Sequence, residues 1–238
     1  MTTSPVNFLL FGASGAIGTA IANQALNRSW IVTATARSLP TAKDERLRWV
    51  QLDPLRDPSS ADGLVASAPY SAVCWAQGSN MSDSVYNVDI SAHMELYNAN
   101  CSYILATLQF LLAKHLLQHG ARLCIISSIW QDIARQTKLS YCMTKAALHG
   151  LVLSASADLA ADGHLINAVL PGALETPMTR KNLKPEEMER IERATGFNRL
   201  ASPEDVASIV CFLCSTENTG ITGQFIAADL GFSRVRFV

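Results

Sequence analysis

Residues 6–18 read VNFLLFGASGAIG, an apolar run that passes directly into a cluster of glycines. The glycines stand at positions 12, 15 and 18, and Ile17, Ile21 and Ala25 then follow at the i, i+4 spacing of a helix. Glycine allows a tight turn and a close approach of backbone to a pyrophosphate, and the positive end of the following helix attracts phosphate groups. The stretch therefore predicts a strand, a phosphate-binding turn and a helix, although its G-x-x-G-x-x-G spacing differs from the common G-x-G-x-x-G.

The same alternation of a short apolar run and a longer helix-like stretch continues along the whole chain. The runs are nearly continuous in apolar character, which is typical of parallel strands covered by helices on both faces. The expected strands are Val6–Phe11, Ile31–Ala36, Trp49–Leu52, Ala72–Ala76, Leu123–Ser127, Leu165–Leu170 and Gln224–Ala228. The pattern predicts a three-layer, doubly wound parallel α/β sheet of the Rossmann type, with residues 1–238 in a single domain.

Composition and charge exclude several classes of protein. Apolar residues make up 49% of the 238 residues and charged residues 16%, which excludes a disordered chain. The net charge of -1, without a basic block, argues against nucleic acid or an anionic membrane as partner. No apolar run is long enough to span a bilayer, and Met1–Asn7 lacks the features of a signal peptide. We expect a cytoplasmic protein that acts on small molecules.

The cysteines and histidines predict no metal site. Most of the six cysteines stand within apolar runs, which is typical of buried thiols in a reducing compartment. Cys211 and Cys214 form a C-x-x-C, which we interpret as two core positions one helical turn apart rather than a redox or metal pair. His115 and His119 have a spacing that a metal could use, but we expect them at the end of a long helix, where polar residues need no metal.

The ends of the second and third strands predict the cofactor. A site for NAD usually has an acidic residue after the second strand, which holds the ribose 2′-hydroxyl, whereas this chain has Ala36-Arg37-Ser38 there. The guanidinium of Arg37 can instead bind a 2′-phosphate, which favours NADP(H) over NAD(H); a solvated surface arginine is the alternative. Asp53, after the third strand, could accept a hydrogen bond from adenine or could be a turn residue.

Four residues fit the reduction of a carbonyl group. Tyr141 and Lys145 stand one helical turn apart on one face, where the ammonium would lower the pKa of the phenol and suit it to proton transfer. Ser128 follows the fifth strand and could polarise the substrate carbonyl. Asn100 lies in a helix expected over residues 92–118, where it could hold a water beside Lys145 or bond to nearby backbone.

Together these motifs resemble the short-chain dehydrogenase/reductase family along essentially the whole chain. The carrying pieces are Gly12–Gly18, Asn100, Ser128, Tyr141–Lys145, Asn167–Gly172, Thr176–Met178, Arg199–Ala207, Ile221–Gln224 and Asp229–Gly231. The resemblance implies that Asn100, Ser128, Tyr141 and Lys145 are the catalytic tetrad. It also implies a homotetramer or homodimer, built through the helices that carry Asn100 and Tyr141 and through the last strand.

The cofactor-binding residues follow from the loop, the strand ends and the resemblance together. Lys145 would also hold the nicotinamide ribose, and Pro171, Gly172 and Thr176 would lie along the nicotinamide. The expected set is Gly12, Ser14, Gly15, Ala16, Ile17, Gly18, Arg37, Ser38, Asp53, Ala76, Gly78, Tyr141, Lys145, Pro171, Gly172 and Thr176.

Several positions depart from the family pattern. Phe11 replaces a threonine before the glycine loop, and Ala16 stands where a glycine is common. The usual Asn-Asn-Ala-Gly after the fourth strand is Trp75-Ala76-Gln77-Gly78, for which we expect altered local packing with cofactor binding retained. Leu230 replaces a glycine in the usual Asp-Gly-Gly.

Residues 173–201 form a charge-rich insertion after the sixth strand. Met188, Ile191 and Thr195 could share one face of a helix. Because ligands bind at the carboxyl ends of such strands, we predict a substrate lid at 173–201, with a solvated helical excursion as the alternative. The segment Ser202-Pro203-Glu204-Asp205 predicts the start of the next helix.

The leading hypothesis is an oxidoreductase that transfers hydride between NADP(H) and a carbonyl or secondary alcohol, with Tyr141 as general acid or base and no metal. The alternatives are an NADP(H)-binding sensor or scaffold without chemistry, an NAD-dependent sugar or nucleotide-sugar dehydrogenase, and an epimerase or isomerase that uses bound cofactor transiently. Substrate identity and physiological direction are not encoded in these patterns.

Overall fold

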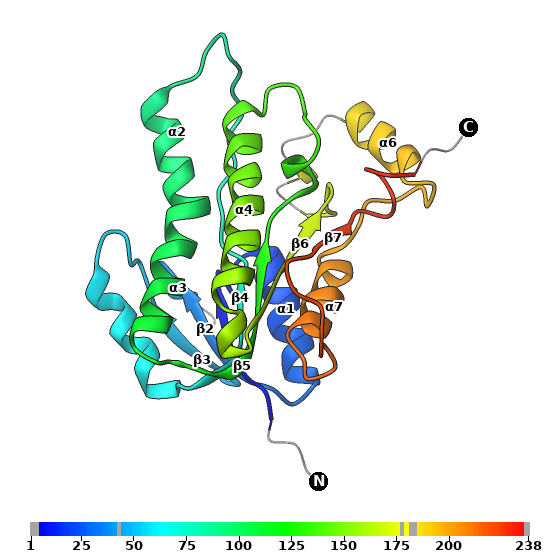
Figure 1. Ribbon diagram of the computed structural model, residues 1–238. Coiled ribbons are helices and arrows are strands. Elements are labelled where there is room, and N and C mark those ends of the chain that lie inside the picture. Colours follow the sequence, from blue (N-terminus) through cyan, green and yellow to red (C-terminus); the bar gives the residue numbers. More distant parts are fainter. Residues whose placement is uncertain (1–4, 42–43, 177–178, 181–184, 236–238) are drawn as a thin grey trace.

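The computed structural model describes residues 5–41, 44–176, 179–180 and 185–235. Within them, seven strands form one parallel sheet in the order β3-β2-β1-β4-β5-β6-β7 (Figure 1). The strands are β1 (Asn7–Phe11), β2 (Ile31–Ala36), β3 (Leu47–Gln51), β4 (Tyr70–Trp75), β5 (Leu117–Ile126), β6 (Leu165–Pro171) and β7 (Phe225–Ala228). The strand order reverses at β1 and β4, and ligands bind beyond the carboxyl ends of strands at such a reversal.

Helices cover both faces of the sheet. The α-helices are α1 (Ala16–Asn27), α2 (Ile90–Tyr97), α3 (Tyr103–Ala113), α4 (Leu139–Asp158), α6 (Pro185–Ala194) and α7 (Pro203–Leu213). Shorter elements are the 3₁₀ helices η1 (Pro58–Ser67), η3 (Ile129–Gln131) and η4 (Ala160–Asp162) and the π-helical turn η2 (Asn98–Ser102). One face packs under α1 and α7, which also contact each other, and the other under α3, α4 and η1.

The alternating side chains of β1 show why the apolar runs are continuous. Leu9 and Phe11 join the apolar cluster under α3 and α4, whereas Phe8 and Leu10 join the cluster under α1 and α7. All four side chains are fully buried, because successive residues of a strand face opposite sides and both sides are covered. The predicted three-layer Rossmann-type sheet is confirmed.

The long helix expected over residues 92–118 is wrong in its interior and at its end. A π-helical turn, η2, separates α2 from α3, and α3 ends at Ala113. His115 lies beyond the helix with a φ of 53°, and His119 belongs to β5, so the two do not share a helical face. Apolar periodicity does not reveal such a turn, since the π-turn interrupts the hydrogen bonding rather than the apolar character.

The insertion between β6 and α7 closes on itself at its base. Leu174 and Ala201 form a bridge, and Glu175 N donates to Ala201 O at 2.8 Å. In α6, Met188 and Ile191 are half-buried and Thr195 just beyond it is buried, in agreement with the expected face. Residues 177–178 and 181–184 lie outside the described residues, and the lid at 173–201 stays a prediction.

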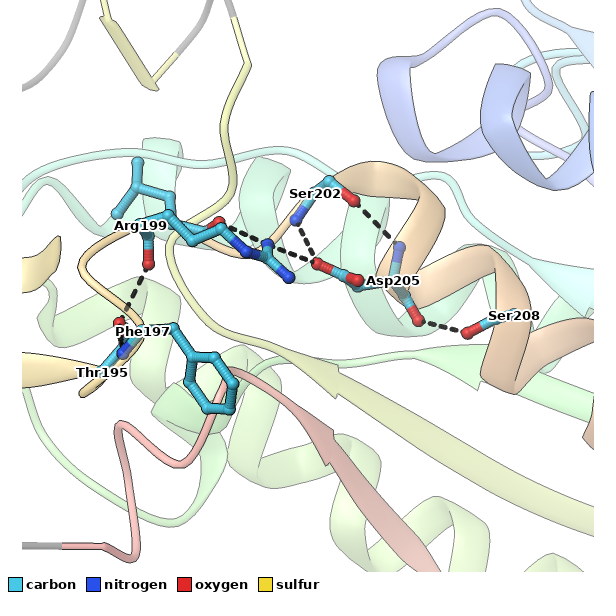
Figure 2. A network of polar contacts seen from close by, with 7 residues as sticks. Thr195, Phe197, Arg199, Ser202, Asp205 and Ser208 are labelled. Carbon is cyan, nitrogen blue, oxygen red and sulfur yellow. Dashed lines mark hydrogen bonds and ion pairs between the residues drawn. The ribbon is translucent and has the colours of Figure 1, made fainter.

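The expected start of α7 is confirmed. The Ser202 hydroxyl accepts a hydrogen bond from Asp205 N, and the Asp205 carboxylate accepts one from Ser202 N, which makes a capping box (Figure 2). Arg199 donates to the same carboxylate at 3.0 Å. The Thr195 hydroxyl in turn donates to the carbonyl of Arg199, so the chain between α6 and α7 is held at both ends.

The C-x-x-C pair occupies the core, as predicted. Cys211 on α7 and Cys214 at its C-cap are both buried, and all six cysteines are free. Nowhere among the described residues do three His, Cys, Asp or Glu side chains gather in a way that could hold a metal ion. Across the same residues, the helices are too short or too polar to cross a lipid bilayer.

Candidate active site

A cavity of about 730 Å³ opens beyond the carboxyl ends of β1, β2 and β4, at the reversal of strand order. Seven of the residues expected to bind the cofactor line it: Gly12, Ser14, Gly15, Arg37, Asp53, Ala76 and Gly78. Ala16, Ile17 and Gly18 form the first turn of α1; neither they nor the exposed Ser38 are among the described residues that line the cavity. The cavity thus lies where the sequence analysis expects a dinucleotide, and binding by these residues stays a prediction.

Gly12 and Gly18 shape the loop because neither position has room for a side chain. Gly12 has a φ of 74°, and a Cβ atom there would lie 2.5 Å from Gln77 N. A Cβ atom on Gly18 would lie 2.2 Å from Gly12 O, so this glycine lets α1 pack directly on the loop. The N-cap of α1 is Gly15, without a side-chain cap, which leaves the first N–H groups of the helix without an intrahelical acceptor. A backbone cradle of this kind fits the pyrophosphate of a dinucleotide.

Two arginines line the cavity beyond the ends of β2 and β3. Arg37 follows β2 and Arg56 lies three residues after Asp53, and both are exposed and line the cavity wall. Within the described part of the chain neither forms a salt bridge. Arg56 was missed in the sequence, although its position close to Asp53 was a usable signal. No acidic residue follows β2 directly, and among the described residues Asp53 and Glu95 are the acidic ones that line this cavity.

The four expected catalytic residues come from three parts of the fold and meet beside the cavity. Ser128 follows β5, Tyr141 and Lys145 project from α4, and Asn100 lies in the π-turn before α3. Lys145 Nζ is 5.6 Å from the centre of the Tyr141 ring and donates to Ile126 O at 3.1 Å. A Cβ atom on Gly78 would lie 3.2 Å from Asn100 Oδ1 and 3.8 Å from Lys145 Nζ, so the cavity wall adjoins the tetrad.

Burial dominates the ionisation of the two titrating groups. It raises the pKa of the Tyr141 hydroxyl to about 12, and hydrogen bonding with Ser128 offsets part of this rise. It also lowers the pKa of the Lys145 ammonium to about 8, against the smaller opposing effect of Cys101. The expected lowering of the Tyr141 pKa by Lys145 is therefore not found, because loss of water disfavours both charged forms.

Asn100 acts as a brace in this structure. Its Oδ1 accepts from Ser79 N at 2.7 Å, and its Nδ2 donates to Ser79 O at 3.1 Å and to Thr144 Oγ1 at 3.0 Å. The amide thus fastens the cavity wall at Ser79 to helix α4 beside Lys145. The alternative, a bond to the backbone of its own helix, is not found, and the water beside Lys145 stays a prediction.

Of the residues expected along the nicotinamide, Pro171 lies beside Ser128, whose Oγ is 3.5 Å from the Pro171 carbonyl oxygen. Gly172 packs against Asp229, with only 2.8 Å between its Cβ position and Asp229 Cβ. Thr176 Oγ1 accepts from Thr179 N at 3.1 Å. These three do not line the large cavity of the described residues, and their role toward a cofactor stays a prediction.

The departures at Phe11 and Trp75 compensate for each other. Their rings stack with centroids 5.4 Å apart, and Phe11 also meets Tyr103 edge-on at 6.0 Å. The indole N–H of Trp75 donates to Thr107 Oγ1 at 2.8 Å, so the buried ring is satisfied. An aromatic cluster therefore occupies the sheet core at the asparagine position, which is the altered packing that we expect. Leu230 adopts a φ of 55°, a conformation that explains glycine in the family pattern.

Comparison with known proteins supports the resemblance. A family model described as Enoyl-(Acyl carrier protein) reductase matches residues 55–233. YmfI of Bacillus subtilis, an uncharacterized oxidoreductase, is 27% identical over 237 residues, which cover 94% of this chain and 97% of YmfI. The 3-oxoacyl-[acyl-carrier-protein] reductase FabG of Rickettsia bellii is 28% identical over 236 residues, with 95% and 96% covered.

Solved structures show the same fold. A short chain dehydrogenase family protein from Francisella tularensis has a TM-score of 0.88 at 22% identity, with 98% of this chain and 100% of that chain covered. ElxO with NADP bound has a TM-score of 0.85 at 24% identity, with 96% and 99% covered. A short chain dehydrogenase from Leptospira borgpetersenii with bound NAD+ has a TM-score of 0.83 at 20% identity, with 97% and 93% covered.

The family match over more than half of the chain and the shared fold agree with the motifs read from the sequence. This chain belongs to the short-chain dehydrogenase/reductase family of oxidoreductases.

Proposed function

We propose that this protein is an NADP(H)-dependent oxidoreductase that interconverts a carbonyl group and a secondary alcohol, with Tyr141 as general acid or base. The observation that carries the proposal is the meeting of Tyr141, Ser128 and Lys145 next to the wall of a dinucleotide-sized cavity. A tyrosine with a hydroxyl partner and a buried ammonium suits proton exchange with a substrate oxygen. A sensor or scaffold protein would have no need of this arrangement.

Each residue has a separate part in the proposed reaction. The nicotinamide, when bound, supplies or accepts the hydride. Ser128 orients the substrate oxygen, and Tyr141 donates a proton to it during reduction or removes one during oxidation. Lys145, held by Ile126 O, holds the ribose of the cofactor beside Tyr141. Asn100 keeps Ser79 and Thr144 in place around Lys145.

The preference for NADP(H) is supported by charge. Arg37 and Arg56 together offer two guanidinium groups at the adenosine end of the cavity, and the second strand ends without an acidic residue. Charge-assisted bonds from arginine to phosphate are among the stronger hydrogen bonds in proteins. ElxO binds NADP, although the Leptospira protein binds NAD+, so the arginines carry this part of the proposal.

The exposed apolar side chains favour a homodimer or homotetramer. Ile90 and Met94 on α2, Leu105 on α3 and Met143 on α4 are each about half exposed or more. Apolar patches on helices that pack side by side are typical of surfaces covered by another subunit. We propose that a second copy of the chain covers this face. With all cysteines free, a reducing cytoplasmic setting suits the assembly.

The proposal is tested by turnover and binding with purified protein. Titration with NADPH and with NADH gives the cofactor preference. A substrate screen should begin with 3-oxoacyl thioesters, because FabG relatives are named for that chemistry, and should include small ketones and sugars. Tyr141→Phe should retain NADPH binding and lower kcat by about 10²- to 10⁴-fold, the usual range for a lost acid or base. Turnover in Tyr141→Phe close to wild type would contradict the proposal, and binding of neither cofactor would favour a scaffold.

A further inference from the structure

Helix α4 carries Tyr141 and Lys145, yet its own sequence does not cap its first turn. The N-cap residue is Lys138, which makes no side-chain cap, and the first turn contains no acidic residue. The first N–H groups of a helix lack intrahelical acceptors, and their satisfaction normally decides how firmly the helix begins. Tyr141 is the third residue of this helix, so any fraying of the first turn would move the phenol.

Asp83, which stands 57 positions before Ser140, supplies the missing cap. Its Oδ1 accepts from Ser140 N at 3.0 Å, its Oδ2 accepts from the Ser140 hydroxyl, and its backbone oxygen accepts from Leu139 N at 3.3 Å. Asp83 N also donates to Thr137 O at 3.2 Å. Asp83 as a whole is 4% exposed, and the negative charge of its carboxylate interacts favourably with the positive end of the helix dipole.

Two further side chains hold the same junction. His93 of α2 approaches Ser140 Oγ with its Nδ1 at 2.8 Å. Because the Ser140 hydroxyl donates to Asp83, His93 is the donor in this contact. Lys138 Nζ donates to Asn80 Oδ1, Met81 O and Ser82 Oγ at 2.9 to 3.0 Å. The start of α4 is thus held to the segment 80–83 by hydrogen bonds from both Lys138 and Ser140.

The segment that caps α4 is also the wall of the cavity. Residues 78–81 line the cavity, and Asn100 holds both backbone groups of Ser79. Two residues later the chain reaches Asp83 and the first turn of α4. A ligand pressing on residues 78–81 therefore acts on a short, hydrogen-bonded connection that ends one residue before Tyr141.

We propose that Asp83 is a positioning residue that couples occupation of the cofactor cavity to the placement of Tyr141 through Ser140. The inference rests on the proposed function, because it assigns Tyr141 the proton transfer. Asp83 is not among the described residues that line the cavity; it acts by capping α4. Through the hydrogen-bonded segment from Gly78 to Asp83, the cavity wall and the first turn of α4 become ordered at the same time.

The test combines kinetics with amide hydrogen exchange on the full-length protein. In Asp83→Ala, kcat should fall about 10- to 100-fold, the order expected when a reacting group is misplaced by about 1 Å. The Kd for NADPH should stay close to wild type. NADPH should slow exchange in the peptide around residues 137–144 of wild type and lose that effect in Asp83→Ala.

Two further variants separate positioning from general destabilisation. Asp83→Asn keeps an oxygen for Ser140 N and should recover most of kcat. Asp89→Ala removes a comparable aspartate cap, because Asp89 Oδ1 accepts from Ser91 N and Ala92 N at the start of α2. Its kcat and its exchange response should remain those of wild type.

The outcomes distinguish this inference from the proposed function. A kcat for Asp83→Ala near wild type overturns the inference, and so does an equal loss in Asp89→Ala or an unchanged exchange response. If Asp83→Ala does not fold, Ser140→Ala tests the same hydroxyl link and should show the same split between kcat and Kd. Full turnover in Tyr141→Phe overturns the proposed function itself. If Tyr141→Phe loses turnover while Asp83→Ala keeps wild-type kcat and exchange behaviour, only the inference about Asp83 is overturned.

Discussion

Replacing Lys145 by methionine should stabilise the ligand-free protein at neutral pH while abolishing turnover. Lys145 is 4% exposed, and burial lowers the pKa of its ammonium from an ordinary value of 10.5 to about 8. That difference corresponds to about 3 kcal/mol of lost stability while the group is charged, since one pKa unit is about 1.4 kcal/mol. Methionine fills a similar volume without a charge.

The expected gain is smaller than this figure because the ammonium also makes a hydrogen bond. Its bond to Ile126 O contributes about 1 kcal/mol, so the net gain at pH 7 is about 2 kcal/mol. For a chain of this length, that gain raises Tm by about 4–8 °C. The neighbouring Tyr141 and Cys101 have pKa values of about 12 and 11, so neither carries charge at neutral pH.

The sign of the pH dependence follows from proton uptake. Between pH 8 and 10.5 the unfolded chain keeps the Lys145 proton and the folded chain has lost it, so wild-type stability rises with pH in that window. Lys145→Met lacks this rise, and its advantage should disappear by about pH 10, where the lost hydrogen bond makes it the less stable protein. Above pH 10 the raised pKa of Tyr141 lowers stability in both proteins alike, because the unfolded phenol loses its proton first.

The assay is urea unfolding and calorimetry of nucleotide-free protein from pH 6.5 to 10.5, with turnover measured on the same samples. Lys114→Met, which removes an exposed ammonium at the end of α3, is the control and should change stability little. A lower Tm for Lys145→Met at pH 7, or a difference from wild type that does not vary with pH, would refute the reasoning about burial.

Three further predictions concern the cavity and the core. Gly12→Ala should lose NADPH binding and at least about 1–2 kcal/mol of stability, because φ is 74° and the new Cβ would lie 2.5 Å from Gln77 N. Gly15→Ala is the control, because its new Cβ would have its nearest contact at 3.6 Å, and it should retain binding. Retained NADPH binding in Gly12→Ala as well would count against the loop geometry. Arg56→Ala should weaken NADPH binding about tenfold or more, for the loss of about 1.5–3 kcal/mol per bond to a charged group, and leave NADH unchanged in calorimetric titration; equal losses for both cofactors would assign Arg56 another role. Thr107→Val should leave the Trp75 indole N–H unpaired and lower the free energy of unfolding by about 1–3 kcal/mol, with kcat unchanged. An unaltered midpoint of urea unfolding would show that this hydrogen bond contributes nothing to stability.

Local patterns in the sequence were enough for the architecture and for the kinds of chemistry present. The glycine loop, the apolar runs and the helix cap at Ser202 each depend on neighbours within a turn or a strand, where periodicity and backbone geometry act directly. Phe11 and Trp75, whose rings stack on each other, were also visible in the sequence as two departures from the family pattern. The ends of strands and helices, in contrast, lie a few residues from where the sequence predicts them, because tertiary contacts decide where backbone pairing stops.

Tertiary structure alone decided how the site is held. The bonds of Asn100 to Ser79 and Thr144 and the cap that Asp83 gives to α4 join segments far apart in the chain. The place of Arg56 on the cavity wall likewise depends on how the strand ends are arranged in space. The pKa values of Tyr141 and Lys145 likewise depend on burial among several elements, which the spacing of the two residues cannot express. Hydrogen bonding and desolvation act through distance in space, so the residue types were readable from the sequence, whereas their partners and ionisation were set only when the sheet brought them together.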